Sequence, residues 1–148
     1  PRPGFAAGPC LVKDTMQLAA FASDRFPLGH SAMQINEGLP TYVVAAMERR
    51  FGSLRGKRVG ILGMAFKAES DDTRASLSYK LRRLLLWAGA EALCTDPHVR
   101  DEELLPLEVV LRDSDIVVLA VPHRAYDELQ VDEGRLVDVW GAFGRIVL

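Results

Sequence analysis

The chain has 148 residues, of which 49% are hydrophobic and 26% are charged, an ordinary globular composition long enough for one domain or two small ones. Its formal net charge of -2 argues against a general nucleic-acid binder, because such proteins carry a marked excess of basic residues. Its longest apolar runs, such as 116–122, are far shorter than the roughly 20 residues needed to cross a bilayer, so we expect no membrane partner.

The beginning of the chain is predicted to be a loop followed by a helix. Residues 1–13 are rich in proline, glycine and alanine, as is typical of a loop. The stretch 14–17 has the form of a capping box, which predicts a helix over about 15–25. Pro27 and Gly29 are expected to end this helix.

A second helical pattern covers 31–52. Apolar residues recur in it at a spacing of four, which is typical of one helix face. Gly38 and Pro40 must kink or divide this helix, because proline removes a backbone donor and clashes with the preceding turn. Gly52 is expected to end it.

From residue 55 onward, short apolar strands alternate with helices. Unbroken apolar strands indicate a parallel sheet covered on both faces, so the predicted fold class is α/β, a helical region followed by a Rossmann-like parallel sheet domain. Ligands of such sheets bind at the carboxyl ends of the strands, where we expect the loop 65–76. The predicted strands are 58–64, 91–95, 116–121 and 136–140, and the predicted helices are 77–88, 101–112 and 124–130.

The turn after the first of these strands lacks the dinucleotide-binding fingerprint. Gly60 and Gly63 lie within the predicted strand, and the G-x-G-x-x-G spacing is absent. We therefore expect that this sheet does not itself hold NAD.

Neither the cysteines nor the histidines show the spacing of a metal site. Cys10 and Cys94 lie far apart, and His30, His98 and His123 are scattered. The chain does not open with a signal-peptide pattern. We expect free thiols, a cytoplasmic location and no bound metal.

A first candidate site surrounds Cys10. A neighbouring cation and a helix N-terminus both favour the thiolate form of a cysteine, and Lys13 and the helix expected from Thr15 offer both. Cys10 is therefore a candidate nucleophile, and Asp14 is a candidate to accept a proton from water or to orient Lys13. The alternative is that Asp14 is only the helix cap and Cys10 a small buried hydrophobic residue.

A second candidate site is the loop 65–76. It presents Lys67, Asp71, Asp72 and Arg74 just before a predicted helix. Helix N-terminal amides and cationic side chains attract anions together, so we interpret the loop as one that faces a phosphate or a nucleotide. In the alternative interpretation the loop is solvated, the two aspartates cap the next helix and Arg74 pairs with them.

Together the two sites resemble the UDP-glucose/GDP-mannose dehydrogenase family of nucleotide-sugar dehydrogenases. That family carries a catalytic cysteine in a glycine-rich loop followed by Lys-Asp, here Cys10, Lys13 and Asp14. It also carries the pattern Phe-Lys-x-x-x-Asp-Asp-x-Arg-x-Ser, which this chain matches at Phe66, Lys67, Asp71, Asp72, Arg74 and Ser76. Asp96-Pro97, at the end of a predicted strand, agrees with the family as well, and the resemblance spans essentially the whole chain.

The resemblance implies two domains. Residues 1–53 would be the end of an active-site loop and a helical central region, with a homodimer formed through 31–52. Residues 55–148 would be the C-terminal domain that grips a UDP- or GDP-linked sugar. The family's N-terminal NAD-binding domain would be missing, so we expect a fragment that is inactive alone, from a parent enzyme whose cofactor is NAD.

The implied reaction oxidises the C6 alcohol of the sugar to a carboxylate with two NAD molecules. Cys10 would be the nucleophile that traps the intermediate aldehyde as a thiohemiacetal, whose second oxidation gives a thioester that water hydrolyses. Asp14 would assist proton transfer and hydrolysis, and Lys13 would support the loop and its charge.

The implied substrate contacts come from the second site. Phe66 and Lys67 would meet the substrate across the domain cleft, whereas Arg74 would either join them or only hold the loop in shape. The chain departs from the family at Phe5 and Ala7, where the family loop commonly carries glycine. It also departs at Trp140, where UDP-glucose members often carry arginine. UDP-N-acetylmannosamine and GDP-mannose type substrates therefore stay open.

Two other functions remain possible from the sequence. The chain could be a non-catalytic nucleotide-sugar-binding or dimerisation module that has kept the fold, or an unrelated Rossmann-like domain whose motifs match by chance. An upstream in-frame segment that encodes G-x-G-x-x-G would favour the enzyme over the binding module.

Overall fold

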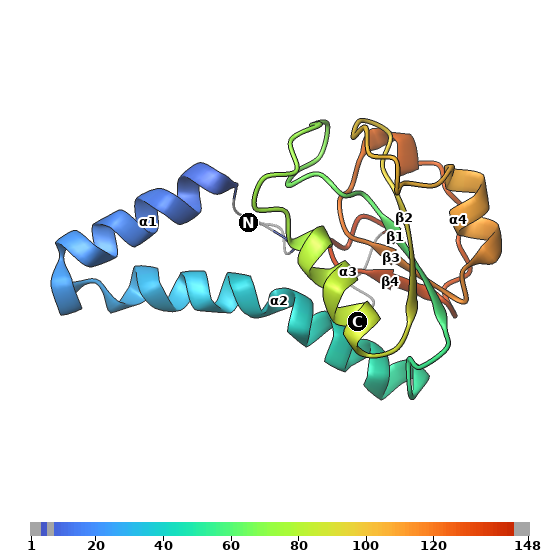
Figure 1. Cartoon of the computed structure of the whole chain (residues 1–148), viewed down its shortest axis with the longest axis horizontal. Helices are drawn as coiled ribbons and strands as arrows, with labels where there is room; N and C mark the ends of the chain where they lie inside the picture. The colour runs from blue at the N-terminus through green and yellow to red at the C-terminus, as the bar shows by residue number, and fades with distance from the viewer. Residues whose placement is uncertain (1–3, 6–7, 144–148) are drawn as a thin grey trace.

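The computed structural model describes residues 4–5 and 8–143. Figure 1 shows a pair of long helices that projects to one side of a parallel sheet, and further helices that lie against the sheet. The helical pair consists of α1 (Pro9–Phe21), a short 3-10 helix η1 (Ser23–Arg25) and α2 (Pro27–Phe51). The predicted class, an α/β fold with a helical region ahead of a parallel sheet, is confirmed.

Helix α1 begins at Pro9, within the predicted loop, and it ends at Phe21. Proline suits the first turn of a helix because its missing N–H would have no partner there and its φ is already helical. Gly8 is the N-cap residue, so Asp14 lies inside the helix and the predicted capping box is wrong. Cys10 consequently lies in the first turn of α1 and not in a loop ahead of it.

Helix α2 begins at Pro27, so the prediction that Pro27 and Gly29 end a helix is also wrong. The helix then continues through Gly38 and Pro40 without being divided. An interior proline costs a helix about 3 kcal/mol, and the burial of Pro40 against the rest of the protein offsets this cost. Gly52 ends the helix as predicted, with φ of 75° and its N–H donating to the Glu48 carbonyl at 3.0 Å.

The sheet has four parallel strands in the order β2-β1-β3-β4. Its strands are β1 (Arg58–Leu62), β2 (Glu91–Thr95), β3 (Ile116–Leu119) and β4 (Leu136–Asp138), and the helices that follow the first three are α3 (Leu77–Trp87), α4 (Leu107–Asp113) and the 3-10 helix η2 (Arg124–Tyr126). Each predicted strand is present, although three of them end earlier than predicted. The predicted helix over 101–112 begins only at Leu107, because Pro106 occupies its N-cap, and the one over 124–130 is reduced to a single 3-10 turn.

The larger hydrophobic core lies between the sheet and helices α2 and α3. Val43 and Met47 of α2, Ile61 of β1 and Leu81 and Leu85 of α3 all belong to it, and each is at most 1% exposed. Burying a side chain of this size stabilises the fold by about 1.5–3 kcal/mol. The second half of α2 is therefore held against the sheet.

Two polar contacts attach α2 to the sheet domain as well. The Lys80 ammonium donates to the Glu37 carbonyl at 2.6 Å and pairs with the Glu37 carboxylate at 3.1 Å. The Arg50 guanidinium donates to the carbonyl of Leu136 at 2.7 Å, just where β4 begins.

On the opposite face of the sheet, a smaller core forms under α4 and η2, with the residues Leu62, Val110, Val117, Leu119 and Tyr126. Among the described residues, no helix is both long and apolar enough to cross a membrane.

Candidate functional site

The loops that follow β1, β2 and β3 meet at the carboxyl edge of the sheet, as a parallel topology requires. The loop after β1 leaves the strand at Gly63, whose φ of 92° lies in the region that favours glycine. A Cβ atom at this position would collide with Val121, two residues after the end of β3. The loop after β1 can therefore lie directly against the neighbouring strand end.

The loop 65–76 is closed by hydrogen bonds at its base. The Phe66 N–H donates to the Asp72 carbonyl at 2.9 Å, and the Ser76 hydroxyl donates to the Ala65 carbonyl at 3.1 Å. Ser76 also caps α3, because its oxygen accepts from the Ser78 N–H at 3.2 Å. The alternative in which Asp71 and Asp72 cap this helix is therefore wrong.

Arg74 pairs with Asp72 inside the loop. Its Nη2 lies 2.7 Å from Asp72 Oδ2, and its backbone N–H donates to Asp72 Oδ1 at 2.9 Å. These side-chain and backbone hydrogen bonds lower the pKa of Asp72 to about 2. The geometry thus gives Arg74 a role in shaping the loop.

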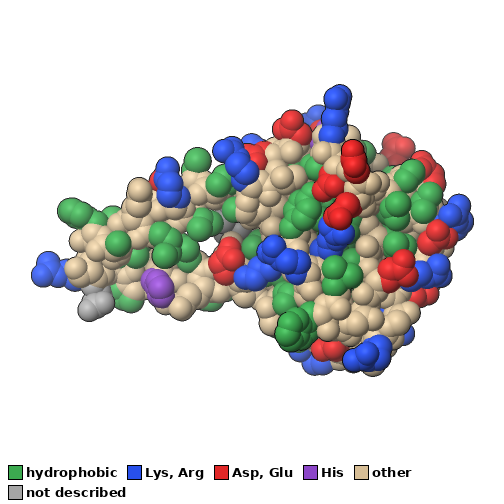
Figure 2. Space-filling model, in the orientation of Figure 1, with side chains coloured by type: hydrophobic (Ala, Val, Ile, Leu, Met, Phe, Trp, Pro, Cys, Tyr) green, Lys and Arg blue, Asp and Glu red, His purple; other side chains and the backbone are tan. Residues whose placement is uncertain are grey.

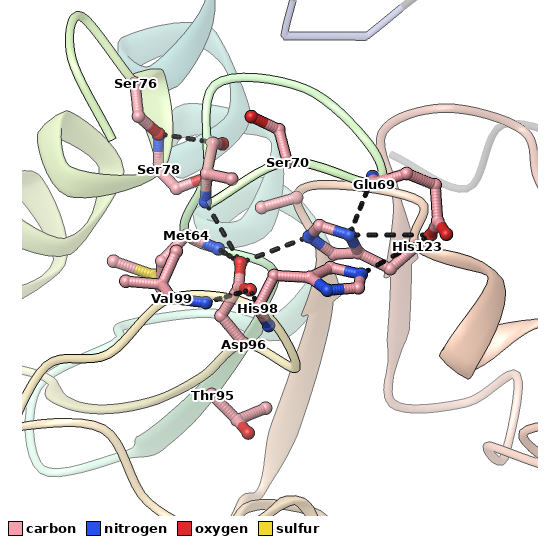
Figure 3. A network of polar contacts seen from close by, with 12 residues as sticks. Met64, Glu69, Ser70, Ser76, Ser78, Thr95, Asp96, His98, Val99 and His123 are labelled. Atoms are coloured by element: carbon pink, nitrogen blue, oxygen red, sulfur yellow. Dashed lines mark hydrogen bonds and ion pairs between the residues drawn. The ribbon is translucent and has the colours of Figure 1, made fainter. Parts of the chain in front are cut away.

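A buried aspartate, Asp96, joins the loops after β1 and β2 (Figure 3). Its Oδ2 accepts from the N–H groups of Met64 at 2.6 Å and Ala65 at 3.0 Å. Its Oδ1 accepts from the N–H groups of His98 at 2.8 Å and Val99 at 3.0 Å. Burial alone would raise the pKa of Asp96, but these hydrogen bonds and one from His123 outweigh it and lower the pKa below its ordinary value.

His123 extends this network to the loop after β3. Its side chain is fully buried, its Nε2 lies 3.1 Å from Asp96 Oδ2, and its Nδ1 accepts the Glu69 N–H at 3.1 Å. Because Nδ1 is the acceptor, the proton of the neutral ring lies on Nε2 and is donated to Asp96. The Glu69 carboxylate accepts the Arg124 N–H at 2.9 Å, and this hydrogen bond lowers the pKa of Glu69. Three loops are thus joined through two buried side chains (Figure 3).

The prediction that the three histidines lie far apart is wrong for His98 and His123. The ring centroids of His98 and His123 are 4.9 Å apart, and one nitrogen atom of each ring and a Glu69 carboxylate oxygen all lie within 4.8 Å of one another. The lone pair of His123 Nδ1 already accepts the Glu69 N–H, so a metal ion would bind there only after that hydrogen bond had broken. Sequence spacing missed this cluster, although both histidines follow a predicted strand, which is the signal that could have found it.

The first candidate site lies at the start of α1, and its charged side chains face solvent. Cys10 is exposed, and Lys13 Nζ lies 3.4 Å from Asp14 Oδ1 in a pair whose members are both more than 60% exposed. An exposed Cys10 contradicts the alternative of a buried hydrophobic residue. The ion pair brings Asp14 and Lys13 together, and the roles of both residues stay predictions.

The two candidate sites lie beside one another. A Cβ atom at Gly8 would be 2.7 Å from Cε2 of Phe66, so the chain just before Cys10 packs its backbone on that ring. The pKa of Arg74 is raised mainly by its hydrogen bond and ion pair with Asp72, with a smaller contribution from Cys10. Lys67 is exposed, with its Nζ 5.5 Å from the centre of the Phe66 ring.

Trp140 holds the segment further upstream. Its indole N–H donates to the Ala120 carbonyl at 2.7 Å, and its ring lies against Gly4, whose φ is 133°. Phe5 is 3% exposed and belongs to the larger core. Ala6 and Ala7 lie outside the described residues. Trp140, noted above as a departure from the family, thus packs against the segment that leads to Cys10.

Comparisons with known proteins identify the family of the chain. Residues 60–145 match the model of the UDP-glucose/GDP-mannose dehydrogenase family, UDP binding domain. The chain is 41% identical over 93 residues to the UDP-glucose 6-dehydrogenase AglM of Haloferax volcanii, covering 61% of this chain and 21% of that protein. It is 32% identical over 126 residues to the UDP-N-acetyl-D-mannosamine dehydrogenase of Pyrococcus horikoshii, covering 82% of this chain and 30% of that protein.

Solved structures of nucleotide-sugar dehydrogenases are also similar to this chain. The UDP-glucose dehydrogenase of Pyrobaculum islandicum superposes with a TM-score of 0.83 at 30% identity, over 93% of this chain and 35% of that one. The GDP-mannose dehydrogenase of Pseudomonas aeruginosa, solved as a ternary complex, superposes with a TM-score of 0.81 at 29% identity, over 99% of this chain and 39% of that one. The chain thus spans between 21% and 39% of the length of these relatives. It belongs to the UDP-glucose/GDP-mannose dehydrogenase family.

Proposed function

We propose that this chain is the C-terminal part of an NAD-dependent nucleotide-sugar 6-dehydrogenase and carries its nucleophile and its nucleotide-sugar contacts. One observation carries the proposal: the backbone before Cys10 packs on Phe66, so the nucleophile and the Lys67 loop lie beside one another. The relatives are named as nucleotide-sugar dehydrogenases and are about three times as long as this chain, which supports a parent enzyme with an NAD-binding domain elsewhere.

In the proposed reaction, Cys10 reacts with the aldehyde formed from the sugar C6 alcohol. Its Sγ adds to the aldehyde carbon, and the resulting oxyanion takes a proton, which gives a thiohemiacetal. Loss of a hydride from that carbon and of the proton from its hydroxyl gives a thioester, and water then displaces Sγ as the thiolate to release the carboxylate. NAD, bound by another part of the protein, would accept the two hydrides. Asp14, about one helical turn after Cys10 in α1, would accept the proton of the attacking water, and Lys13 would hold Asp14 through their ion pair.

Lys67 is the proposed contact to the phosphates of the nucleotide. It is exposed at the carboxyl edge of the sheet, and within the described residues no carboxylate lies in ion-pair distance of its Nζ. Phe66 would offer its ring beside the sugar. Arg74 would act mainly through Asp72, since both its Nε and Nη2 already donate to that carboxylate.

A second proposal concerns assembly: two copies pair through the helical pair, including the segment 31–52. Large apolar side chains stand exposed on these helices, between 48% and 89% accessible, and Figure 2 shows apolar surface over this part of the molecule. They are Leu11, Met16, Leu18, Phe21, Leu28, Ile35 and Tyr42. Exposed apolar surface of this kind marks an interaction site more often than a solvated face. The same surface would serve a non-catalytic binding module, which remains the alternative function.

Isothermal titration calorimetry of this chain tests the nucleotide proposal. We expect binding of UDP or GDP and the matching nucleotide sugar, chosen from UDP-glucose, UDP-N-acetylmannosamine and GDP-mannose, and none of NAD. Lys67→Ala should weaken binding by about tenfold or more, because a charge-assisted contact contributes about 1.5–3 kcal/mol. Lys57→Ala, at the opposite edge of the sheet, is the matched control and should leave the Kd unchanged. Equal affinity of the two variants would remove Lys67 from the site.

A further inference from the structure

The conformation of the Lys67 loop is set at Glu69, two positions further along. Glu69 has φ of 55°, in the left-handed region that residues other than glycine adopt at a cost. Its N–H donates to His123 Nδ1 at 3.1 Å, and its carboxylate accepts the Arg124 N–H at 2.9 Å. His123 lies in the loop after β3, and Arg124 begins the η2 turn that follows it. The tip of the Lys67 loop is therefore held from a neighbouring loop across the carboxyl edge of the sheet (Figure 3).

His123 is itself held in a single orientation. Its side chain is fully buried, and its Nε2–H donates to Asp96 Oδ2 at 3.1 Å. The ring of Tyr126 lies edge-on to it, with 5.7 Å between the two ring centroids. Asp96 keeps four backbone N–H donors besides His123, from Met64, Ala65, His98 and Val99. The Asp96 carboxylate therefore keeps hydrogen-bond donors without His123. The position of the ring proton of His123, in contrast, depends on Asp96.

The hydrogen bond from Glu69 to His123 is only partly buried. Glu69 is an exposed residue, so its N–H could bond to water if the loop relaxed out of the left-handed conformation. What the bond achieves is a fixed backbone two residues after Lys67. Its geometric consequence is thus the direction in which Lys67 leaves the loop.

We propose that His123 is a positioning residue of the nucleotide-sugar site: its Nδ1 holds Glu69, and thereby Lys67, in the conformation that meets the ligand. The inference rests on the proposed function for the identity of the ligand. The positioning itself can be measured without any ligand.

Two substitutions separate the two nitrogen atoms of the ring. The amide of asparagine reaches the place of Nδ1, so His123→Asn keeps an acceptor for Glu69 and loses the donor to Asp96. The amide of glutamine reaches the place of Nε2, so His123→Gln keeps the donor to Asp96 and loses the acceptor. His98→Gln is the matched control, because the His98 ring lies beside the His123 ring, tilted by 56°, and approaches the Glu69 carboxylate at 3.7 Å without bonding to the Glu69 N–H.

Amide hydrogen exchange and calorimetry with the nucleotide sugar that binds most tightly give the two readouts. We expect the Glu69 amide to exchange faster in His123→Gln than in His123→Asn, and the Kd of His123→Gln to be about tenfold weaker, as for one lost hydrogen bond. His123→Asn and His98→Gln should bind within about twofold of the unchanged chain, a difference of only a few tenths of a kcal/mol.

The outcomes are distinguishable. Equal loss in His123→Gln and His123→Asn would show a purely structural role and overturn the proposal, as would unchanged exchange and affinity in His123→Gln. If the exchange differs as expected but the unchanged chain binds no nucleotide sugar, the proposed function fails while the coupling of His123 to the loop stands. If His123→Gln does not fold, amide hydrogen exchange in the unchanged chain tests the proposal instead. Its Glu69 amide should exchange more slowly than that of Lys67, which donates no hydrogen bond within the described residues, and equal rates would overturn the proposal.

Discussion

Asp96 shows how one residue determines the geometry of this site. It lies just after β2, yet it accepts hydrogen bonds from the start of the loop after β1, from its own loop and from His123 after β3. A buried carboxylate with so many donors is stable as an anion. Its family motif, Asp-Pro after a strand, was visible in the sequence, but its partners were not, because they are far away along the chain.

The stability of the protein should therefore depend on pH through Asp96. The folded state lowers the pKa of this group, so its contribution is complete above the value of about 3.9 of an unfolded aspartate and is lost as the pH falls through the folded value. At pH 7 we expect Asp96→Asn to lower the unfolding free energy by about 1–3 kcal/mol. The gap between the two proteins should shrink below about pH 4. Urea unfolding across this range measures it, and parallel curves would contradict the assignment.

The two cysteines should differ in reactivity. Cys10 is exposed at the start of α1, whereas Cys94 is 2% exposed in β2 and its burial raises the pKa of its thiol to about 11. Thiolate is the reactive form. We expect iodoacetamide to label one thiol in each folded chain, and Cys10→Ala to abolish that labelling in mass spectrometry. Comparable labelling of Cys94 in the folded protein would contradict the packing described here.

At the scale of elements, Ser76 connects the candidate site to a helix. Its hydroxyl caps α3 and also closes the base of the Lys67 loop through the Ala65 carbonyl. The two roles explain why the serine of the family motif stands at the junction of loop and helix. The loop conformation and the start of α3 are therefore coupled.

Ser76→Ala should destabilise the fold through both contacts. Loss of an N-cap side chain costs about 1 kcal/mol, within a range of about 0.5–2, and the buried Ala65 carbonyl would lose its partner. Chemical denaturation measures the change. Ser53→Ala, at an exposed serine whose hydroxyl accepts only a 3.3 Å contact from the Arg55 N–H, is the control and should change stability by less than about 0.5 kcal/mol. Equal stabilities of the two variants would contradict the capping role.

The sequence predicted the sheet better than the helical pair, and the reason is physical. Each strand is a short apolar run. A strand that is buried on both faces of a parallel sheet must be apolar along its whole length, so its local sequence identifies it. Pro9 and Pro27 begin helices here, but proline also ends them, so the local signal pointed the wrong way at both positions. The buried contact between Asp96 and His123 arises only from the order of the strands, which local patterns do not contain.

At the scale of the whole molecule, the chain joins a well-packed sheet domain to a projecting helical pair (Figure 1). The second half of α2 shares the core of the sheet, whereas α1 has no buried residue among those described. The two helices α1 and α2 pack on each other with one face each. The apolar side chains on their other faces need a partner. The division at 53–55 and the homodimer both remain proposals.

The homodimer proposal can be tested by a single charge on the exposed face. Ile35 is 68% exposed on α2, so Ile35→Glu should convert a dimer into a monomer without unfolding it. Trp87→Glu is the control, because Trp87 is 91% exposed on α3, which is not one of the helices of the proposed interface. Sedimentation velocity should show the mass of two chains for the control and of one chain for Ile35→Glu. A monomer in both, and in the unchanged protein, would reject the proposed interface.

The central claim is that Cys10 and the Lys67 loop form one nucleotide-sugar site, and protection of Cys10 from alkylation tests it most directly. The rate of Cys10 labelling by iodoacetamide is measured with and without the nucleotide sugar that calorimetry shows to be saturating. We predict that the bound nucleotide sugar slows the labelling of Cys10 severalfold, and that NAD at the same concentration does not. An unchanged labelling rate at full occupancy would place the bound nucleotide sugar away from Cys10 and contradict the account.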